Sequence, residues 1–211
     1  MVVKFKFYFR KSSFKKDLDS AYLLLSEIEK YKPKNFLEVG VYQGVTSRNV
    51  CEKLKTIHNT NFNFFGIDLF EDSNTDLDNK EMTVKHNRIS NPIKHLIFNL
   101  ILKKDLNCMD SVKSLLGKFQ SNTKLLKGFS EEQLLNLDLE KIDFVFLDGG
   151  HSYETVKKDL EILISKLKIG KIIICDDYDQ VSYGVKKAVD ELSSKVTEIK
   201  DLNGRLVRIT I

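Results

Sequence analysis

The chain has 211 residues, of which 42% are hydrophobic, and it carries a formal net charge of +4. This length and composition predict a single domain, residues 1–211, with a sizeable core rather than a disordered chain. No run of about 18 apolar residues occurs, so no membrane-spanning helix is expected. The 34 basic residues nearly balance the 30 acidic ones and are almost all lysine, so nucleic acid is not the expected partner.

The N-terminus and the cysteines bear on where the protein works. Met1–Lys11 is apolar and basic, but charges interrupt it and no small-residue cleavage site follows, so we expect no signal peptide. Three scattered cysteines predict a reduced, cytoplasmic chain. The alternation in Lys4–Phe9 fits an edge strand, an arm to the partner subunit of a homo-oligomer or part of a lid. The simplest interpretation is a surface extension, residues 1–16.

The first half of the chain predicts helix, strand, helix and strand. Apolar residues of Asp17–Tyr31 share one helical stripe, which Pro33 ends. Asn35–Gly44 is a short strand that runs into glycines, and a helix follows from about Thr46. Asn63–Phe70 is a second strand.

The turn after the first strand has the composition of a ligand-binding turn. Glu38, Gly40 and Gly44 form an E-x-G-x-x-x-G pattern. Glycines there let a ligand approach the backbone, and the next helix presents N–H groups to anionic atoms. The spacing differs from G-x-G-x-x-G, which disfavours a dinucleotide. Asp68 ends the second strand, where an acid is placed to bind ribose hydroxyls, although it could also be a capping residue.

A long segment without a clean period follows the second strand. Such a segment in a compact domain is usually functional or mobile. We therefore interpret residues 72–105 as a lid over a substrate pocket. His86 and His95 are nine residues apart, which is not the spacing of a helical metal pair, so we interpret both as ordinary histidines.

The remaining elements outside the central stretch alternate between helical and extended patterns. Asn203-Gly204 is a two-residue hairpin signal, so the sheet is expected to end in an antiparallel hairpin. The expected helices are Met109–Phe119, Glu131–Leu137 and Val181–Leu192, and the expected strands are Thr123–Leu126, Lys195–Ile199 and Leu206–Ile211.

Acidic residues end both strands of a predicted strand–helix–strand unit. The apolar run Ile142–Leu147 ends at Asp148, and the run Lys171–Cys175 ends at Asp176-Asp177. The segment between them has helical spacing, so the two strands are expected to be parallel and to end on the same edge of the sheet. That edge is where open α/β sheets bind ligands.

The chemistry of this edge points to a metal ion and a base. Asp148, Asp176 and Asp177 would repel one another unless a cation joined them, and oxygen ligands suit Mg²⁺. His151 lies three residues past Asp148, where a neutral imidazole can take a proton from a hydroxyl held on the metal. The alternative is that these acids cap turns and helices and that His151 is a cap or surface residue.

Five stretches carry a resemblance to a known family: FLEVGVYQGVTSRNV, GIDLF, VFLDGGHSYETVKKDL, GKIIICDDYD and GVKKAVDEL. They resemble class I S-adenosylmethionine-dependent methyltransferases, and more narrowly the metal-dependent O-methyltransferases that include the macrolide-sugar enzymes. The resemblance implies that Asp148, Asp176 and Asp177 bind Mg²⁺ and that His151 is the base. It further implies residues that hold the cofactor: Glu38, Gly40, Gly44 and Thr46 at its methionine part, Asp68 at its ribose, and Gly128 and Ser130 near its adenine.

The expected fold is a Rossmann-like, doubly wound, mostly parallel seven-stranded α/β sheet with an antiparallel C-terminal hairpin. The expected activity is methyl transfer from S-adenosylmethionine to a hydroxyl of a small molecule or sugar, with Mg²⁺. Three alternatives stay open: methylation of RNA or protein, a related hydroxylase-like enzyme, and a cofactor-binding protein without catalysis.

Overall fold

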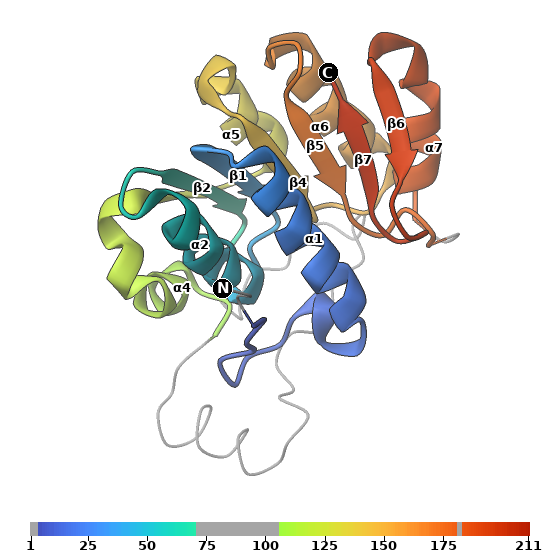
Figure 1. Ribbon diagram of the computed structural model, residues 1–211. Coiled ribbons are helices and arrows are strands. Elements are labelled where there is room, and N and C mark those ends of the chain that lie inside the picture. Colours follow the sequence, from blue (N-terminus) through green and yellow to red (C-terminus); the bar gives the residue numbers. More distant parts are fainter. Residues whose placement is uncertain (1–3, 71–105, 181–182) are drawn as a thin grey trace.

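The computed structural model describes residues 4–70, 106–180 and 183–211, and its centre is one seven-stranded sheet (Figure 1). The strand order is β3-β2-β1-β4-β5-β7-β6. Strands β1 to β5 are parallel, whereas β7 is antiparallel to both β5 and β6. The mostly parallel sheet with an antiparallel end is therefore confirmed. The strands are β1 Asn35–Val39, β2 Asn63–Asp68, β3 Thr123–Lys127, β4 Phe144–Leu147, β5 Ile172–Cys175, β6 Glu198–Asp201 and β7 Val207–Thr210.

Helices cover both faces of the sheet (Figure 1). One buried cluster joins the sheet to α1, α2 and α4, and the other joins it to α5, α6 and α7. The helices are α1 Leu18–Tyr31, α2 Val45–His58, α4 Met109–Leu115, α5 Ser130–Leu135, α6 Tyr153–Lys166 and α7 Val185–Glu191. Short 3₁₀ helices are η1 Ser13–Lys16, η3 Gly117–Asn122, η4 Leu139–Lys141 and η5 Ser193–Lys195.

The central strands are apolar because helices bury both of their faces. Every residue of β4 and of β5 is buried, as expected for the interior of a parallel sheet. Phe36 of β1 stacks between Phe64 of β2 and Phe144 of β4, with ring centres 5.9 and 5.2 Å away. This apolar centre fixes the strand register that brings the acidic strand ends together.

The chain reverses its direction of travel across the sheet between β1 and β4. From β1 it proceeds to β2 and β3, and it then returns to β4 and β5 on the other side of β1. Ligands of open α/β sheets bind outside the carboxyl ends of the strands at such a reversal. We therefore expect the functional site at the carboxyl ends of β1 and β4.

The C-terminal hairpin differs from its prediction. The expected strand Lys195–Ile199 is wrong in its bounds, because Lys195 ends η5 and β6 begins only at Glu198. The last strand pair is Asp201 with Val207, so five residues connect the strands rather than Asn203-Gly204 alone. A hydrogen bond within the longer turn stabilises it, because Asn203 Oδ1 accepts the N–H of Leu206 at 2.9 Å.

The N-terminal segment packs into the domain, so its interpretation as a surface extension is wrong. Phe5 and Phe14 belong to the buried core. The backbone of Lys6 exchanges two hydrogen bonds with the side chain of Asn49 in α2, at 2.9 and 2.8 Å. The predicted lid, residues 72–105, lies outside the described residues. No helix among the residues that the structure describes is long and apolar enough to cross a membrane.

Candidate functional site

The acidic residues after β4 and β5 lie side by side at one edge of the sheet. The two strands are parallel neighbours, with Leu147 paired to Cys175. The N–H of Asp148 donates to the carbonyl of Val39 in β1 at 2.8 Å, and that of Asp176 donates to the carbonyl of Leu147 at 3.0 Å. The predicted adjacency of the two strand ends is thus confirmed.

Three side chains at this edge face one another. One possible ligand atom from each of Asp148, His151 and Asp177 lies within 4.8 Å of the others. All three residues are half-buried. Nε2 of His151 lies 3.0 Å from Oδ2 of Asp177. The same residues line a small cavity of about 10 Å³, room for roughly one ion or water molecule.

Asp176, the third predicted ligand, lines the same small cavity but is also paired with an arginine. Its carboxylate is 2% exposed and accepts two hydrogen bonds from Arg205, at 2.6 and 2.7 Å. Sequence reasoning missed Arg205, because nothing in its local pattern marks an arginine in a hairpin turn as the partner of a strand end.

The electrostatics of the edge favour a cation. Burial raises the pKa of Asp148 well above its usual range, and the negative charges of Asp176 and Asp177 raise that pKa further. Burial also raises the pKa of Asp176, against the opposite effect of Arg205. Clustered carboxylates with uncompensated charge are hard oxygen ligands. The residues present therefore fit a divalent ion of the Mg²⁺ type.

Three further contacts hold the group in place. The ring of His151 packs on the ring of Tyr183, with centres 4.5 Å apart, and the carbonyl of His151 accepts the N–H of Gly184 at 2.8 Å. The hydroxyl of Ser13 in η1 donates to Oδ2 of Asp148 at 3.2 Å. Ser13 is a second residue that the sequence did not indicate, because 135 residues separate it from Asp148.

The glycine turn after β1 adjoins the acidic edge. Gly40 has φ +93°, and a Cβ added there would lie 2.0 Å from the carbonyl oxygen of Asp148. Gly44, with φ +74°, caps α2 at its N-terminus, and Thr46 in the first turn of that helix is buried. Both glycines thus occupy left-handed conformations that favour glycine.

Glu38 lies beneath this turn as a buried carboxyl. It is 1% exposed, and its Oε2 accepts the Ser47 hydroxyl at 2.5 Å. Burial raises the pKa of Glu38 to about 8. Its Oε1 has no hydrogen-bond partner among the residues that the structure describes. A buried polar atom without a partner is costly, and a bound ligand or water is a common explanation.

Asp68 ends β2 beside the same turn. Its Oδ2 accepts the N–H of Tyr42 at 2.7 Å, and its Oδ1 accepts the N–H of Phe70 at 2.8 Å. Each carboxylate oxygen keeps a second lone pair for a ligand hydroxyl. The carbonyl of Asp68 accepts the N–H of Gly128 at 3.0 Å, and Ser130 begins α5 two residues later. The structure therefore brings the predicted ribose and adenine residues together.

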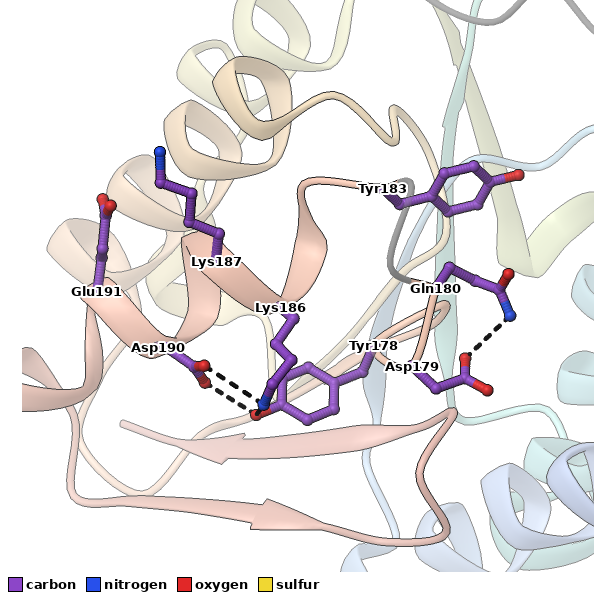
Figure 2. A pocket seen from close by; sticks show the side chains of 8 residues that line it. All are labelled: Tyr178, Asp179, Gln180, Tyr183, Lys186, Lys187, Asp190 and Glu191. Carbon is purple, nitrogen blue, oxygen red and sulfur yellow. Dashed lines mark hydrogen bonds and ion pairs between the residues drawn. The ribbon is translucent and has the colours of Figure 1, made fainter.

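A larger cavity of about 600 Å³ lies against the exposed side of α7 (Figure 2). Tyr183 connects the two places, since it both lines this cavity and packs on His151. Tyr178 accepts a hydrogen bond from Lys186 at 2.7 Å and donates one to Asp190 at 2.8 Å. The cavity is lined by Tyr178, Asp179, Gln180, Tyr183, Lys186, Lys187, Asp190 and Glu191.

The sequence itself matches a known family. Residues 37–178 match the family described as a methyltransferase domain. The chain belongs to this family. It is a class I S-adenosylmethionine-dependent methyltransferase, whose glycine turn and acidic edge both lie within the matched residues. No curated protein matches the methyltransferase in a sequence search.

Solved structures share the fold of this methyltransferase at low sequence identity. CalS11, a calicheamicin methyltransferase, has a TM-score of 0.61 at 18% identity, over 93% of this chain and 80% of that one. The O-methyltransferase NovP has a TM-score of 0.59 at 19% identity, over 92% and 79%. An O-methyltransferase from Bacillus cereus in complex with SAH has a TM-score of 0.60 at 12% identity, over 95% and 84%.

Proposed function

We propose that this methyltransferase transfers a methyl group from S-adenosylmethionine to a hydroxyl oxygen of a small molecule or sugar, with the aid of Mg²⁺. The observation that carries the proposal is the approach of Asp148, His151 and Asp177 to within 4.8 Å of one another beside the glycine turn. A base next to paired carboxylates suits an acceptor that must lose a proton before it attacks a methyl group.

The cofactor would lie along the ends of β1 and β2. Glu38, Gly40, Gly44 and Thr46 would surround its methionine part, and this role is supported by the left-handed glycines and by the unpartnered Oε1 of Glu38. Asp68 would accept hydrogen bonds from the ribose hydroxyls. Gly128 and Ser130, next to Asp68 in space, would contact the adenine. S-adenosylmethionine supplies the methyl group when it is bound.

Asp148 and Asp177 would hold the Mg²⁺ ion. A bound divalent cation lowers the pKa of a hydroxyl and offsets its developing negative charge. The cavity of about 10 Å³ between these side chains supports this assignment. Asp176, the third predicted ligand, lines the same cavity and would complete the set by exchanging its contacts with Arg205 for the ion.

His151 would take the proton from the acceptor hydroxyl. The carboxylate of Asp177, 3.0 Å from Nε2, orients the imidazole and would stabilise the imidazolium that forms. Tyr183 packs on one side of the same ring and restricts its rotation. Most of the acceleration would come from holding the two reactants in line, as expected for a transfer between bound groups.

Two further observations support a small acceptor. The cavity of about 600 Å³ that Tyr183 lines has the size of a small-molecule site and mixes aromatic with polar side chains. Two proteins with a similar fold are described as O-methyltransferases, and CalS11 is also described as a TDP-rhamnose 3′-O-methyltransferase.

The proposal is tested with S-adenosylmethionine that carries a tritiated methyl group. The purified protein is incubated with small hydroxylated acceptors, RNA or protein, in Mg²⁺ or in excess EDTA, and the label in each fraction is counted. We expect label in the small-molecule fraction in the presence of Mg²⁺ and none in the presence of EDTA. Label in RNA or protein would show that the acceptor is a macromolecule rather than a small molecule. Label that persists in EDTA would show that methyl transfer does not need the metal.

A further inference from the structure

The N-terminal segment contacts the glycine turn after β1, residues 40–44, from 33 positions earlier in the chain. We infer that Arg10 is a positioning residue for the cofactor, because it holds this turn in the shape that binds S-adenosylmethionine. The inference rests on the proposed function, which places the methionine part of the cofactor at the turn.

The backbone of the turn is strained. Gly40, Tyr42 and Gly44 have φ +93°, +50° and +74°, so every second residue is left-handed. Glycine adopts such a conformation readily, whereas a bulky residue such as tyrosine seldom does. A strained residue keeps its conformation only where the surrounding structure dictates it. The turn therefore depends on partners outside its own sequence.

Arg10 supplies four hydrogen bonds that join the turn to α4. Its Nη1 donates to the carbonyls of Gln43 and Leu106, at 3.1 and 3.3 Å. Its Nη2 donates to the carbonyl and to the hydroxyl of Ser111, at 2.9 and 3.0 Å. The four N–H groups of these two nitrogens thus match four acceptors. One planar side chain fixes the turn, the residue Leu106 and the first helical turn of α4 relative to one another.

The side chain of Gln43 completes the same connection. It is 3% exposed. Its Oε1 accepts the N–H of Lys11 at 2.7 Å, and its Nε2 donates to Oδ1 of Asn107 at 2.9 Å. Arg10 and Lys11 therefore hold the backbone and the side chain of Gln43 together. The next residue, Gly44, packs directly on α4, because a Cβ added there would lie 2.9 Å from Cγ1 of Val112.

The acceptors of Arg10 are neutral oxygens rather than carboxylates. Among residues 4–70, 106–180 and 183–211, no carboxylate forms an ion pair with Arg10, and burial lowers its pKa to about 10. Removing a charge from water without an opposite charge is unfavourable. The contacts are therefore explained by geometry, because a guanidinium presents its donors in a fixed fork that suits several carbonyls.

The turn that Arg10 holds also contacts the proposed ribose residue, since Oδ2 of Asp68 accepts the N–H of Tyr42 at 2.7 Å. Without Arg10 the strained turn would relax in the free protein, and the cofactor would have to order it again on binding. Ordering a segment on binding lowers affinity. Once the cofactor is bound, the site has its usual geometry, so the chemical step is expected to be unchanged.

The test titrates S-adenosylhomocysteine into the full chain by calorimetry. Arg10→Gln is expected to raise its Kd about tenfold. Gln43→Met, which removes the contacts to Lys11 and Asn107, is expected to raise it at least about threefold. The control is Lys171→Gln, because this half-buried cation pairs with Asp143 at 2.6 Å and directly precedes β5, at the opposite end of the strands. It should bind within about twofold of the wild type.

Steady-state kinetics separate positioning from folding. In Arg10→Gln the KM for S-adenosylmethionine should rise about tenfold, while kcat at saturating cofactor stays within about twofold of the wild type. A residue that only stabilised the fold would instead lower the fraction of active protein. The number of binding sites per chain and kcat would then fall, with the Kd for S-adenosylhomocysteine unchanged. That result overturns the inference.

Asp68→Asn distinguishes a failure of the inference from a failure of the proposed function. It should raise the Kd at least about tenfold, because the ribose loses a charged acceptor. If Asp68→Asn binds weakly and Arg10→Gln binds as the wild type does, only the inference is overturned. If both bind normally, or the wild type binds no S-adenosylhomocysteine, the proposed cofactor site is contradicted as well. If Arg10→Gln does not fold, Gln43→Met decides by the same criteria.

Discussion

Nε2 of His151 lies 3.0 Å from Oδ2 of Asp177, and the imidazole ring packs on Tyr183 at 4.5 Å between ring centres. Contacts on two sides fix the orientation of the imidazole before an acceptor binds. A general base is most effective when it is held within hydrogen-bond reach of the proton that it removes.

Replacement of His151 by alanine is expected to lower kcat by about 10²–10⁴, the range that general-base catalysis contributes. Affinity for S-adenosylhomocysteine, measured by titration calorimetry, should change by less than about threefold, because His151 is assigned to the acceptor rather than to the cofactor. A loss of kcat smaller than tenfold would indicate that another residue is the general base.

Replacement of Asp148 by asparagine is expected to abolish Mg²⁺-dependent turnover, because one of the proposed carboxylate ligands loses its charge. The measurement is the initial rate as a function of Mg²⁺ concentration. The matched control is Asp110→Asn, since the Asp110 side chain is 92% exposed and lies in α4, apart from the acidic edge. Similar rates for the two variants would contradict the metal assignment.

Glu38 is expected to make the stability of the cofactor-free protein depend on pH. Burial raises its pKa to about 8 from 4.5, so the folded state keeps a proton that the unfolded state releases. Folding is therefore penalised increasingly as the pH rises from 4.5 to 8. In Glu38→Gln this penalty is absent.

Urea unfolding across this pH range measures the effect. The free energy of unfolding of Glu38→Gln relative to the wild type is expected to grow by at most about 1.4 kcal/mol per pH unit and to level off above about pH 8. The other titrating groups contribute equally to the two proteins, so their effects cancel in the difference between the two free energies of unfolding. Parallel curves for the two proteins would show that Glu38 ionises freely in the fold.

Gly40 should be far less tolerant of a side chain than a glycine in open space. A Cβ at Gly40 would lie 2.0 Å from the carbonyl oxygen of Asp148, whereas Gly170, with φ +84°, has nothing within 4 Å of an added Cβ. Gly170→Ala is expected to cost about 1–2 kcal/mol, the cost of a left-handed alanine. Gly40→Ala is expected to cost more than about 4 kcal/mol. Equal losses in thermal unfolding would contradict the close approach of the turn after β1 to Asp148.

The N-terminal segment should contribute to stability through its buried phenylalanine. Phe14 is fully buried and packs on Phe146, with ring centres 6.0 Å apart. Phe14→Ala is expected to lose about 3–5 kcal/mol in chemical denaturation. The control Ile169→Ala removes a side chain that is 90% exposed, and it should change stability by less than about 0.5 kcal/mol. A small effect at Phe14 would restore the interpretation of residues 1–16 as a surface extension.

The parts of the fold that the sequence predicts are those with strong local patterns. β4 and β5 are buried on both faces, so each is an uninterrupted apolar run in the sequence. The first acidic residue after each run, Asp148 or Asp176, therefore marks the end of the strand. The residues of β6 are mostly exposed and show no apolar alternation. For that reason its bounds and the length of the following turn were predicted incorrectly.

The parts of the site that the sequence does not predict depend on contacts between distant segments. Arg205 meets Asp176 across 29 residues, and Ser13 meets Asp148 across 135. Neither contact has a periodic signal. The sequence therefore predicts the three aspartates that end β4 and β5, but it does not predict that Asp176 also pairs with Arg205 or that Ser13 contacts Asp148.

The central claim is that the methyl group goes to oxygen, with a cation at Asp148 and Asp177. It is tested most directly by ¹³C NMR of the small-molecule product formed from S-adenosylmethionine with a ¹³C-labelled methyl group, with Mg²⁺ or with excess EDTA. We expect a methyl-ether resonance that appears with Mg²⁺ and is absent with EDTA. A methyl resonance on nitrogen or carbon, or an ether that forms equally well in EDTA, would contradict the account.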